Sequence, residues 1–494
     1  MTPIEIVSII QSLEKDLPLK NLTIDGINYW PIARIYLGFE LDDNRSNGTV
    51  GTVKNSLYKR IRSRLKPYTS GLFRNSVPRD IWNRTGDRQV VFLTYTEARR
   101  IRVENGIIDG YLDPIYKKLG SQNDGFFVDY TSSKHYGGGT NLDPFGFSLS
   151  TVNASKKAFV NLLFSRKDKE LDWFFDLLDQ LLLRKGVTKN IDKRRLKFRI
   201  LLILELVDHY SHLFKKLNAR ILIGSNYYGL EMAASIAAHQ VGMKVVDVQH
   251  GGQGPAHHAY ADWPDIGRPF EALPDVFWTW DQFSKDNIDK WGYKHSRAVV
   301  GGHTLLLSSI VERASSEMIL QAIEASKKPN KPNVLVTLQK GVDVLDFIAE
   351  LILKSPDKVK WWVRLHPGMM SELDNFINFF HKELGRNDVE VELASSCPLF
   401  IILLEMQLHI TAFSSVLQDA SIFKVPSIAI DRRAKSLFEQ EYRNNEFEVN
   451  EDVCDILQKL KVISAIEVNN KSLGNILDMQ NRLLVAAYSE VISY

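Results

Sequence analysis

His250 is the residue whose type and surroundings point most directly to chemistry. It follows the β-favouring run Val245 to Val248, and Gly251, Gly252 and Gly254 come directly after it. An imidazole titrates near neutral pH and can act as a general base, while glycines let a chain bend sharply or let a ligand approach the backbone. The glycines lack the spacing of a dinucleotide fingerprint. The stretch therefore predicts a glycine-rich loop beside a candidate base; a purely structural histidine is the commoner alternative.

A second set of candidate residues lies in the second half of the chain. Arg364 and His366 close the apolar run "KVKWWVRLH". Side chains two apart on a strand share a face, so both would point toward one phosphate or carboxylate. Ser414 and Ser415 join an apolar run to a helical pattern, and serine-capped helix starts bind anions. The four residues predict a phosphate site; taken singly, a salt-bridged arginine and an ordinary helix cap are the alternatives.

The elements that must position these residues form two similar series. Short apolar runs alternate with amphipathic segments on both sides of the Lys/Pro/Asn-rich linker 326–333. Continuous apolar strands separated by helices are typical of parallel sheets covered on both faces. We therefore predict an α/β protein with two doubly wound domains, whose ligands bind in a cleft between the carboxyl ends of the strands.

The boundaries follow from this pattern. The predicted strands are 90–95, 125–130, 219–225, 244–249, 275–280 and 297–302 in the first domain, and 333–339, 358–366, 389–393, 408–413 and 426–430 in the second. The predicted domains are an N-terminal helical and basic extension (1–84), a first α/β domain (85–325), a second α/β domain (326–435) and C-terminal helices packing back on the domains (436–494).

Composition excludes several classes of protein. The 494 residues are 44% hydrophobic and 24% charged, which is typical of a globular protein. The two cysteines, Cys397 and Cys454, form neither a disulfide framework nor a metal-binding pattern, which fits a reducing cytoplasm. The first residues lack the features of a signal peptide, and no apolar window is long enough to span a bilayer. We therefore expect a cytoplasmic protein that is not integral to a membrane.

Charge is unevenly distributed, although the net charge is only +3. Residues 44–79 contain no acid, and their basic side chains are interleaved with aromatic and aliphatic ones. Such a stretch can bind an anionic membrane surface, with each cation contributing about 1 kcal/mol. The alternative is a solvated linker. No recognised nucleic-acid module surrounds it, so we expect peripheral membrane contact at the inner face of the cytoplasmic membrane and no nucleic-acid partner.

In this order, the motifs resemble those of GT-B glycosyltransferases of bacterial surface polysaccharide (capsule and O-antigen) biosynthesis, over roughly residues 85–435. "RLHP" at 364–367 is similar to the HP motif, and Ser414-Ser415 to the serine motif, of enzymes that use CMP-activated sialic acid or Kdo. Teichoic-acid-type glycerophosphotransferases carry both motifs with an acid in the next helix, here Asp419, and "QHGG" resembles their His-Gly pair. Two departures are Gln249, where those polymerases carry tryptophan, and the missing two-carboxylate-plus-glycine motif of bacterial sialyltransferases.

The resemblance implies a GT-B fold of two Rossmann-like domains facing across a cleft, and a role for each motif. His366, Ser414 and Ser415 would bind the phosphate of the donor, with Arg364 assisting. His250 would be the base, or would orient the acceptor. The residues that would contact the acceptor are Gly251, Gly252, His257 and Trp263.

Carboxylates are alternative candidates for the base. Asp129 ends a predicted strand, and Glu97 opens a loop beside Arg99 and Arg100, where an acceptor could dock. A solvated turn is the commoner interpretation of such a cluster. The chain contains no D-x-D sequence, so cationic side chains and a helix dipole would have to stabilise the leaving phosphate. We expect a reaction without metal or other cofactor.

The function predicted from these residues is a glycosyltransferase. It would move a sugar from a nucleotide-activated donor, CMP-Kdo-like in one version, to a lipid-linked or oligosaccharide acceptor in a growing surface polysaccharide. One alternative is a CDP-alditol phosphotransferase, which makes phosphodiesters from CDP-glycerol or CDP-ribitol. Others are a non-catalytic glycan-binding or scaffolding subunit and a non-hydrolysing sugar-nucleotide epimerase of the same fold.

Overall fold

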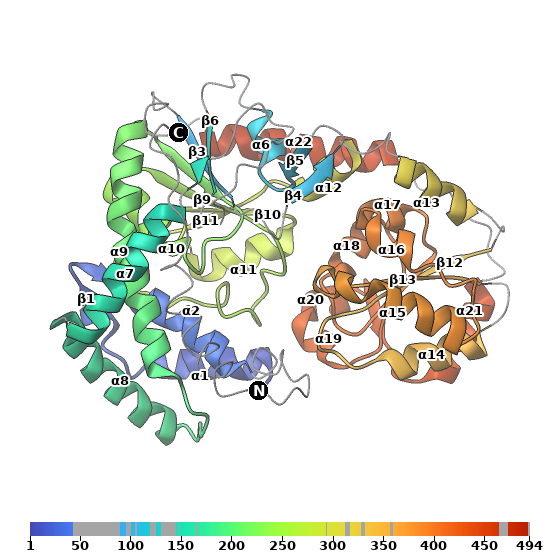
Figure 1. Ribbon diagram of the computed structural model, residues 1–494, viewed down its shortest axis with the longest axis horizontal. Helices are drawn as coiled ribbons and strands as arrows, with labels where there is room; N and C mark the ends of the chain where they lie inside the picture. Colours follow the sequence, from blue (N-terminus) through green and yellow to red (C-terminus); the bar gives the residue numbers. More distant parts are fainter. Residues whose placement is uncertain are drawn as a thin grey trace. The chain divides into compact units, whose positions relative to one another are not determined.

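The computed structural model describes most of the chain as two compact units (Figure 1). Unit 1 comprises Met1–Leu305 and Arg482–Tyr494, and unit 2 comprises Leu306–Asn481. The structure describes residues 1–42, 89–94, 100–103, 106–118, 125–129, 145–146, 148–164, 166–292, 294–311, 317–327, 331–355, 359–463 and 473–492. The basic stretch 44–79 and the candidate base Glu97 lie outside these ranges.

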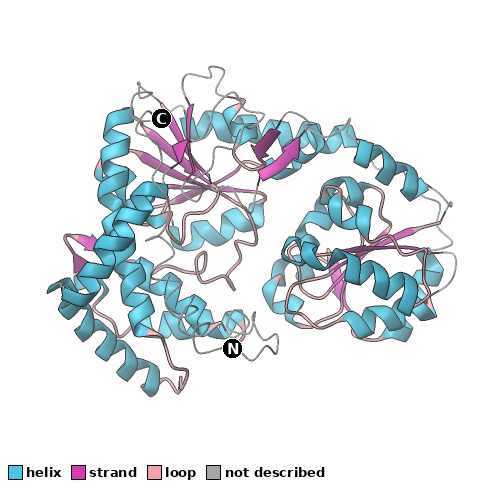
Figure 2. Ribbon diagram, viewed as in Figure 1, coloured by secondary structure: helices cyan, strands magenta, loops and turns pink. Residues whose placement is uncertain are grey.

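Unit 1 is built on a parallel sheet, with helices around it (Figure 2). Among the described residues the strand order is β11 (Arg297–Val300), β10 (Val276–Thr279), β9 (Lys244–Val248), β8 (Ile221–Gly224), β3 (Val90–Thr94), β6 (Gly125–Asp129) and β7 (Phe145–Gly146). Every neighbouring pair runs parallel. Strands β3, β8 and β10 are buried along their whole length, as expected for a sheet covered on both faces. The six strands predicted for this domain are confirmed.

The longest helix of unit 1, α9 (Lys193–Leu217), packs against α7 and α10. Its first turn is capped by Asp192, whose carboxylate accepts a hydrogen bond from the Arg195 amide at 3.0 Å, and it ends at Asn218 with φ of 48°. The remaining elements are β4 (Arg100–Val103), β5 (Gly106–Asp109), α6 (Asp113–Tyr116), α7 (Ser148–Phe164), α8 (Arg166–Arg184), α10 (Met232–Gln240), α11 (Gln282–Gly292) and the end of α22 (Leu473–Ile492).

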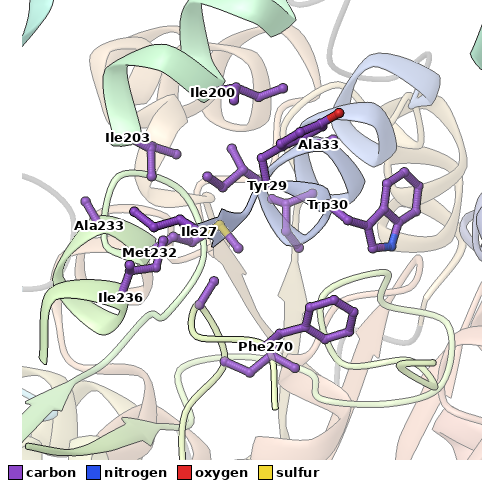
Figure 3. Close-up of a cluster of buried hydrophobic side chains, with 14 of the residues drawn as sticks. Ile27, Tyr29, Trp30, Ala33, Ile200, Ile203, Met232, Ala233, Ile236 and Phe270 are labelled. Atoms are coloured by element: carbon purple, nitrogen blue, oxygen red, sulfur yellow. The ribbon is translucent and has the colours of Figure 1, made fainter. Parts of the chain in front are cut away.

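The N-terminal 42 residues belong to the core of unit 1. They form α1 (Pro3–Glu14), η1 (Leu19–Asn21), the hairpin β1 (Thr23–Ile24) and β2 (Ile27–Asn28), and α2 (Trp30–Leu41). Figure 3 shows Ile27 and Trp30 in one apolar cluster with Ile203 of α9 and Met232 of α10. Residues 1–42 are therefore part of unit 1, whereas the sequence suggested an extension separate from the first domain.

Unit 2 has its own parallel sheet. Within the described part its order is β13 (Lys360–Arg364), β12 (Asn333–Thr337), β14 (Leu408–Thr411), β15 (Ser427–Ala429) and β16 (Phe447–Val449). The predicted fold class, α/β with two doubly wound Rossmann-like domains, is confirmed. Its helices are α12 (Thr304–Val311), α13 (Glu317–Lys327), α14 (Leu345–Lys354), η3 (Pro367–Glu372), α15 (Leu373–Asn378), η4 (Phe379–Glu383), α16 (Glu392–Ser396), α17 (Leu399–Leu404), α18 (Val416–Ile422), α19 (Arg433–Leu437), α20 (Glu439–Arg443), α21 (Val453–Ile463) and the start of α22.

Two expectations for this half differ from the structure. The run 389–393 was expected to be a strand, but it forms only one bridge, between Glu390 and Trp362, and then enters α16. The Glu390 carboxylate accepts a hydrogen bond from the Leu393 amide at 2.9 Å, which favours the turn into the helix. The expected domain end at 435 falls inside unit 2, because β16 adds a strand to its sheet.

Among the described helices, none combines the length and the apolar character needed to cross a membrane.

Candidate functional site

The candidate residues fall on one edge of each sheet. In parallel sheets the carboxyl ends of the strands meet at the same edge, where ligands bind. In unit 1, His250 follows β9 and the segment 225–228 follows the adjacent strand β8. In unit 2, His366 follows β13 and Ser414 follows β14, the two strands on either side of β12.

Gln249 shapes the turn that carries His250. Its side-chain oxygen accepts a hydrogen bond from the Trp280 amide at 2.6 Å, and its side-chain nitrogen donates to the Gly251 carbonyl at 2.9 Å. The indole of Trp280 donates in turn to the Gln249 carbonyl at 3.0 Å. The glutamine is completely buried. Gln249, which stands where the polymerases that "QHGG" resembles carry tryptophan, therefore has a structural role: it fixes the backbone on both sides of the histidine.

His250 is half-buried and contacts two tyrosines. The Tyr228 hydroxyl lies 3.2 Å from His250 Nε2, and the Tyr111 hydroxyl donates to the His250 carbonyl at 3.3 Å. The first contact requires a proton on one of its two partners, so the tautomer of His250 decides which group donates. A histidine that shares a proton with a phenol is chemically equipped to take a proton from a substrate hydroxyl.

The sequence analysis did not identify Tyr228, which is at the centre of an aromatic cluster. Its ring lies 5.5 Å from that of His257 and 5.8 Å from that of His250, measured between centroids. Asn226 braces this turn by donating to the Tyr228 carbonyl at 2.9 Å and to the Glu231 carboxylate at 2.8 Å. The signal was available, since Tyr228 follows a predicted strand that pairs with the strand before His250.

The glycine loop leaves space at one position. A Cβ atom added to Gly251 would meet no heavy atom within 4 Å. Gly251 and Gly252 are half-buried, as is His257, whose Nδ1 accepts a hydrogen bond from the Ala259 amide at 3.2 Å. A ligand could therefore reach the backbone beside His250.

Trp263 lies elsewhere. Its side chain is buried, its indole donates to the Ala259 carbonyl at 2.9 Å, and the Arg34 guanidinium stacks 3.9 Å from the centre of its ring. The expectation that Trp263 offers an open ring to an acceptor beside His250 is not supported by these contacts. The sequence places Trp263 in a loop close to histidines, but it does not reveal that the ring packs against Arg34 of α2.

The carboxylates of this edge fall into two groups. Asp129 is the last residue of β6, in register with Thr94 of β3. Asp109 and Asp247 are buried, and both accept hydrogen bonds: Asp109 from Thr94 and the Tyr111 amide, Asp247 from the Tyr260 hydroxyl. Asp109 and Asp247 therefore stabilise the surrounding loops.

In unit 2, a hydrogen bond from the backbone fixes the tautomer of the neutral His366 ring. Its Nδ1 accepts a hydrogen bond from the Gly368 amide at 3.0 Å, so the neutral ring carries its proton on Nε2. Desolvation by the surrounding protein and the positive charge of Lys340 lower the pKa of His366. The side chain is exposed. It can therefore donate a hydrogen bond from Nε2 to an anion at neutral pH.

Two cations that the sequence analysis missed lie at the same edge. Lys340 follows β12, and its side chain comes within 3.3 Å of the position that a Cβ on Gly368 would occupy. Arg433 packs on Phe413, with its guanidinium carbon 4.1 Å from the ring centre, and forms an ion pair with Asp431 at 2.6 Å. Burial opposes ionisation of Asp431, but hydrogen bonds from Arg433 outweigh it and lower the pKa. Lys340 directly follows a predicted strand, which was an available signal.

Arg364 has a different environment from His366. Its Nη1 donates to the carbonyls of Ala394 and Cys397, both at 2.6 Å. These carbonyls lie at the end of α16, where a cation satisfies exposed acceptors. The expectation that Arg364 reaches the same anion as His366 is not supported by these contacts, and we assign it a structural role.

Ser414 and Ser415 precede α18 as predicted, but the capping differs. The Ser414 hydroxyl accepts a hydrogen bond from the Val416 amide at 3.3 Å, while Ser415 makes no capping bond through its side chain. Both serines are half-buried. Because α18 spans only seven residues, we base an anion site on side chains and not on the helix dipole. Within the described residues, no cluster of His, Cys, Asp and Glu has the arrangement of a metal site.

Comparisons with known proteins complete the description. No protein-family model matches the chain, and no curated protein sequence matches it. Among solved structures, the UDP-GlcNAc 2-epimerase of Methanocaldococcus jannaschii is similar with 14% identity and a TM-score of 0.48, covering 81% of this chain and 99% of that one. The UDP-GlcNAc 2-epimerase of Neisseria meningitidis, bound to UDP-GlcNAc, has 12% identity and a TM-score of 0.44, covering 81% and 100%.

A wall teichoic acid polymerase, TagF, is also similar, with 10% identity and a TM-score of 0.37 over 91% of this chain and 93% of that chain. Likeness at these values carries no argument about activity, so the function is inferred from the residues of this chain.

Proposed function

We propose that the protein is a glycosyltransferase that moves a sugar from a nucleotide-activated donor to a growing bacterial surface polysaccharide. Unit 2 would hold the donor and unit 1 would activate the acceptor. The observation that carries the proposal is the combination of a neutral His366 and the Lys340 cation at the carboxyl edge of unit 2. Such an edge suits a phosphate, which needs hydrogen-bond donors and positive charge together.

The donor phosphate would be bound by side chains alone. His366 would donate from Nε2, Lys340 would supply charge, and Ser414 and Ser415 would donate from their hydroxyls. The interactions of these groups with the phosphate become stronger as negative charge develops on it when it leaves. We therefore propose a reaction without a metal ion, in which the nucleotide-sugar is a co-substrate.

The acceptor would be activated at His250. A general base contributes typically 10²–10⁴-fold to a rate, and here Tyr228 would hold the ring toward the acceptor hydroxyl. Gly251, Gly252 and His257 would contact the acceptor, because they are half-buried around the histidine. Asp129 stays an alternative base.

Nucleotide-dependent stabilisation tests the donor half of the proposal. We expect one of CMP, CDP, UDP or GDP to raise the midpoint temperature of thermal unfolding of the full chain. The same nucleotide should not raise the midpoint temperature of His366→Ala. CMP alone would indicate a Kdo or sialic-type donor, and UDP or GDP a hexose donor. His212→Ala, which removes an exposed imidazole from α9, is the matched control. Equal response of both variants would contradict the donor site.

The second candidate is a CDP-alditol phosphotransferase of the teichoic-acid type. It is favoured by the imidazole of His250, which follows β9, and by the resemblance of "QHGG" to the His-Gly pair of those polymerases. It predicts that CDP-glycerol or CDP-ribitol is consumed with release of CMP. Loss of nucleotide release in His366→Ala would exclude the third candidate, a non-catalytic scaffold.

The membrane contact is proposed from the basic stretch 44–79 alone, together with a lipid-linked acceptor and a location at the inner face of the cytoplasmic membrane. Flotation with liposomes tests this directly. Enrichment on vesicles that contain anionic lipid, relative to neutral vesicles, is the expected result, and equal partitioning would count against it.

A further inference from the structure

A cavity of about 200 Å³ opens in unit 1 at the amino ends of the strands. Asp275 and Ser296, which directly precede β10 and β11, line it, and so does His239 near the end of α10. His250 follows the opposite, carboxyl end of β9. The cavity is therefore distinct from the candidate site, although the single loop 249–275 runs from one to the other.

The walls of the cavity are aromatic and apolar. Trp263, Phe270, Leu273 and Trp291 line it. The indole of Trp291 donates to the Tyr260 carbonyl at 3.0 Å, and that of Trp263 donates to a carbonyl as described above. Both indole N–H groups are thus engaged, and the rings contribute apolar surface to the cavity.

Charged groups of both signs surround these walls. Asp265 pairs with Lys294 and lies 3.7 Å from His295. The other pairs around the cavity are Arg268 with Glu271 at 3.5 Å and His239 with Asp275 at 3.0 Å. Because each acid has a basic partner, the rim offers hydrogen-bond donors and acceptors without a strong net charge.

We propose that this cavity binds one neutral sugar ring of the acceptor glycan, away from the reacting end. A sugar ring has apolar faces that pack on aromatic side chains and hydroxyls that bond to carboxylates and guanidinium groups. The volume is below the roughly 300–1,000 Å³ of sites for drug-sized ligands, which suits a single ring. A phosphate or a nucleotide fits less well, because the basic groups of the rim are already paired with carboxylates.

This inference rests on the proposed function, since it assumes that the substrate is a glycan. It adds a second contact on unit 1, which would let the protein prefer long acceptors over short ones. Strand β9 is five residues long, so the two edges of the sheet are about 16 Å apart. A chain of a few sugar units could extend from the cavity to His250.

Fluorine NMR of the full chain labelled with 5-fluorotryptophan tests the site. The chain has nine tryptophans, and the signals of Trp263, Trp291 and Trp280 are assigned by substituting each with phenylalanine. The probes are methyl glycosides of glucose, galactose, mannose, rhamnose and the two N-acetylhexosamines, with CMP and inorganic phosphate for comparison. Trp280, which contacts Gln249, reports on the His250 edge.

We expect at least one glycoside to shift the Trp263 and Trp291 signals while that of Trp280 stays constant. Arg268→Ala should weaken this binding about threefold to tenfold, as expected for one lost hydrogen bond. Arg443→Ala, which removes an exposed arginine paired with Glu439 in unit 2, should leave it unchanged. Two results would overturn the proposal. One is a shift of the Trp263 and Trp291 signals on addition of CMP or phosphate, and the other is the absence of any shift with every glycoside.

The two proposals fail separately. Loss of nucleotide binding at unit 2 would contradict the donor site and leave the glycoside shifts intact. Conversely, a nucleotide effect that depends on His366, without any glycoside shift, would keep the proposed transferase and remove the cavity as a glycan site.

Discussion

The Tyr228 hydroxyl lies 3.2 Å from Nε2 of His250, so residues after two adjacent strands of unit 1 share one proton. This pair belongs to an aromatic cluster that also includes His257. The Tyr228 hydroxyl contacts the ring of His250, the proposed base. Removal of the base should therefore lower the reaction rate more than removal of the tyrosine hydroxyl.

Substitution of His250 should separate chemistry from donor binding. We expect His250→Ala to lower the turnover rate by about 10²–10⁴-fold and to leave nucleotide binding unchanged. Tyr228→Phe should cost about threefold to tenfold, the value of one hydrogen bond. Initial rates with the donor identified by the nucleotide panel measure both. The controls are His212→Ala and Tyr442→Phe, and a larger loss in Tyr228→Phe than in His250→Ala would contradict the assignment.

Gly251→Ala tests whether an acceptor approaches the loop. A Cβ at this position meets open space, so we expect the free energy of unfolding to stay within about 0.5 kcal/mol of the parent. If a sugar approaches the backbone there, the KM for the acceptor rises while donor binding is constant. Thermal unfolding and acceptor titrations give both values. An unchanged KM would remove Gly251 from the acceptor site.

The charge of Lys340 should be visible in the titration of His366. Desolvation and Lys340 lower the pKa of His366 from its ordinary value of 6.5, so Lys340→Met should raise it. Phosphate binding should raise it as well, because an anion favours the protonated imidazole. The ring signals of His366 in a pH-dependent NMR titration report both effects. Lys354→Met, on α14 beside Glu350, is the matched control and should leave His366 unchanged.

His409 makes the stability of unit 2 depend on pH. It is completely buried between Thr337 at 2.9 Å and Ser427 at 3.2 Å, and burial lowers its pKa to about 3. The folded pKa is below the unfolded value of about 6.5, so the unfolded chain binds the proton first. The contribution is complete above pH 6.5 and decreases toward pH 3, by about 1.4 kcal/mol per pH unit.

Chemical denaturation of the parent and of His409→Asn at several pH values checks this expectation. The variant should be less stable at pH 7, because it leaves a hydroxyl of the buried trio without its partner, but its stability should fall less steeply on acidification. Parallel curves for the two proteins would show that another group controls the pH dependence.

Chelation should leave the reaction intact. In the proposal, His366, Lys340 and the two serines stabilise the leaving phosphate, so EDTA should change the rate by less than about twofold, whereas Lys340→Met should lower it by about 10-fold or more. Addition of Mg²⁺ or Mn²⁺ after EDTA treatment is the control. A rate that is lost with EDTA and restored by either ion would contradict the proposed mechanism.

Much of the fold could be predicted because burial on both faces leaves a direct trace in sequence. The runs that became β3, β8 and β10 are almost entirely apolar, and their positions in the chain also place the turns that follow them. The same logic placed His250, His366 and Ser414 at carboxyl edges. It was wrong for 389–393, where the Glu390 carboxylate accepts a hydrogen bond from the Leu393 amide and so favours a helix.

The sequence by itself determined the two α/β units and the edge on which each candidate residue lies, because both follow from the periodicity and length of short segments. Only the tertiary structure decided which side chains meet. It joined Tyr228 to His250, turned Arg364 toward the carbonyls of α16, and packed Trp263 on Arg34 from α2. These contacts connect residues that are distant in sequence or lie on separate elements. They arise from the way helices, strands and loops pack together, and the local sequence pattern contains no information about that packing.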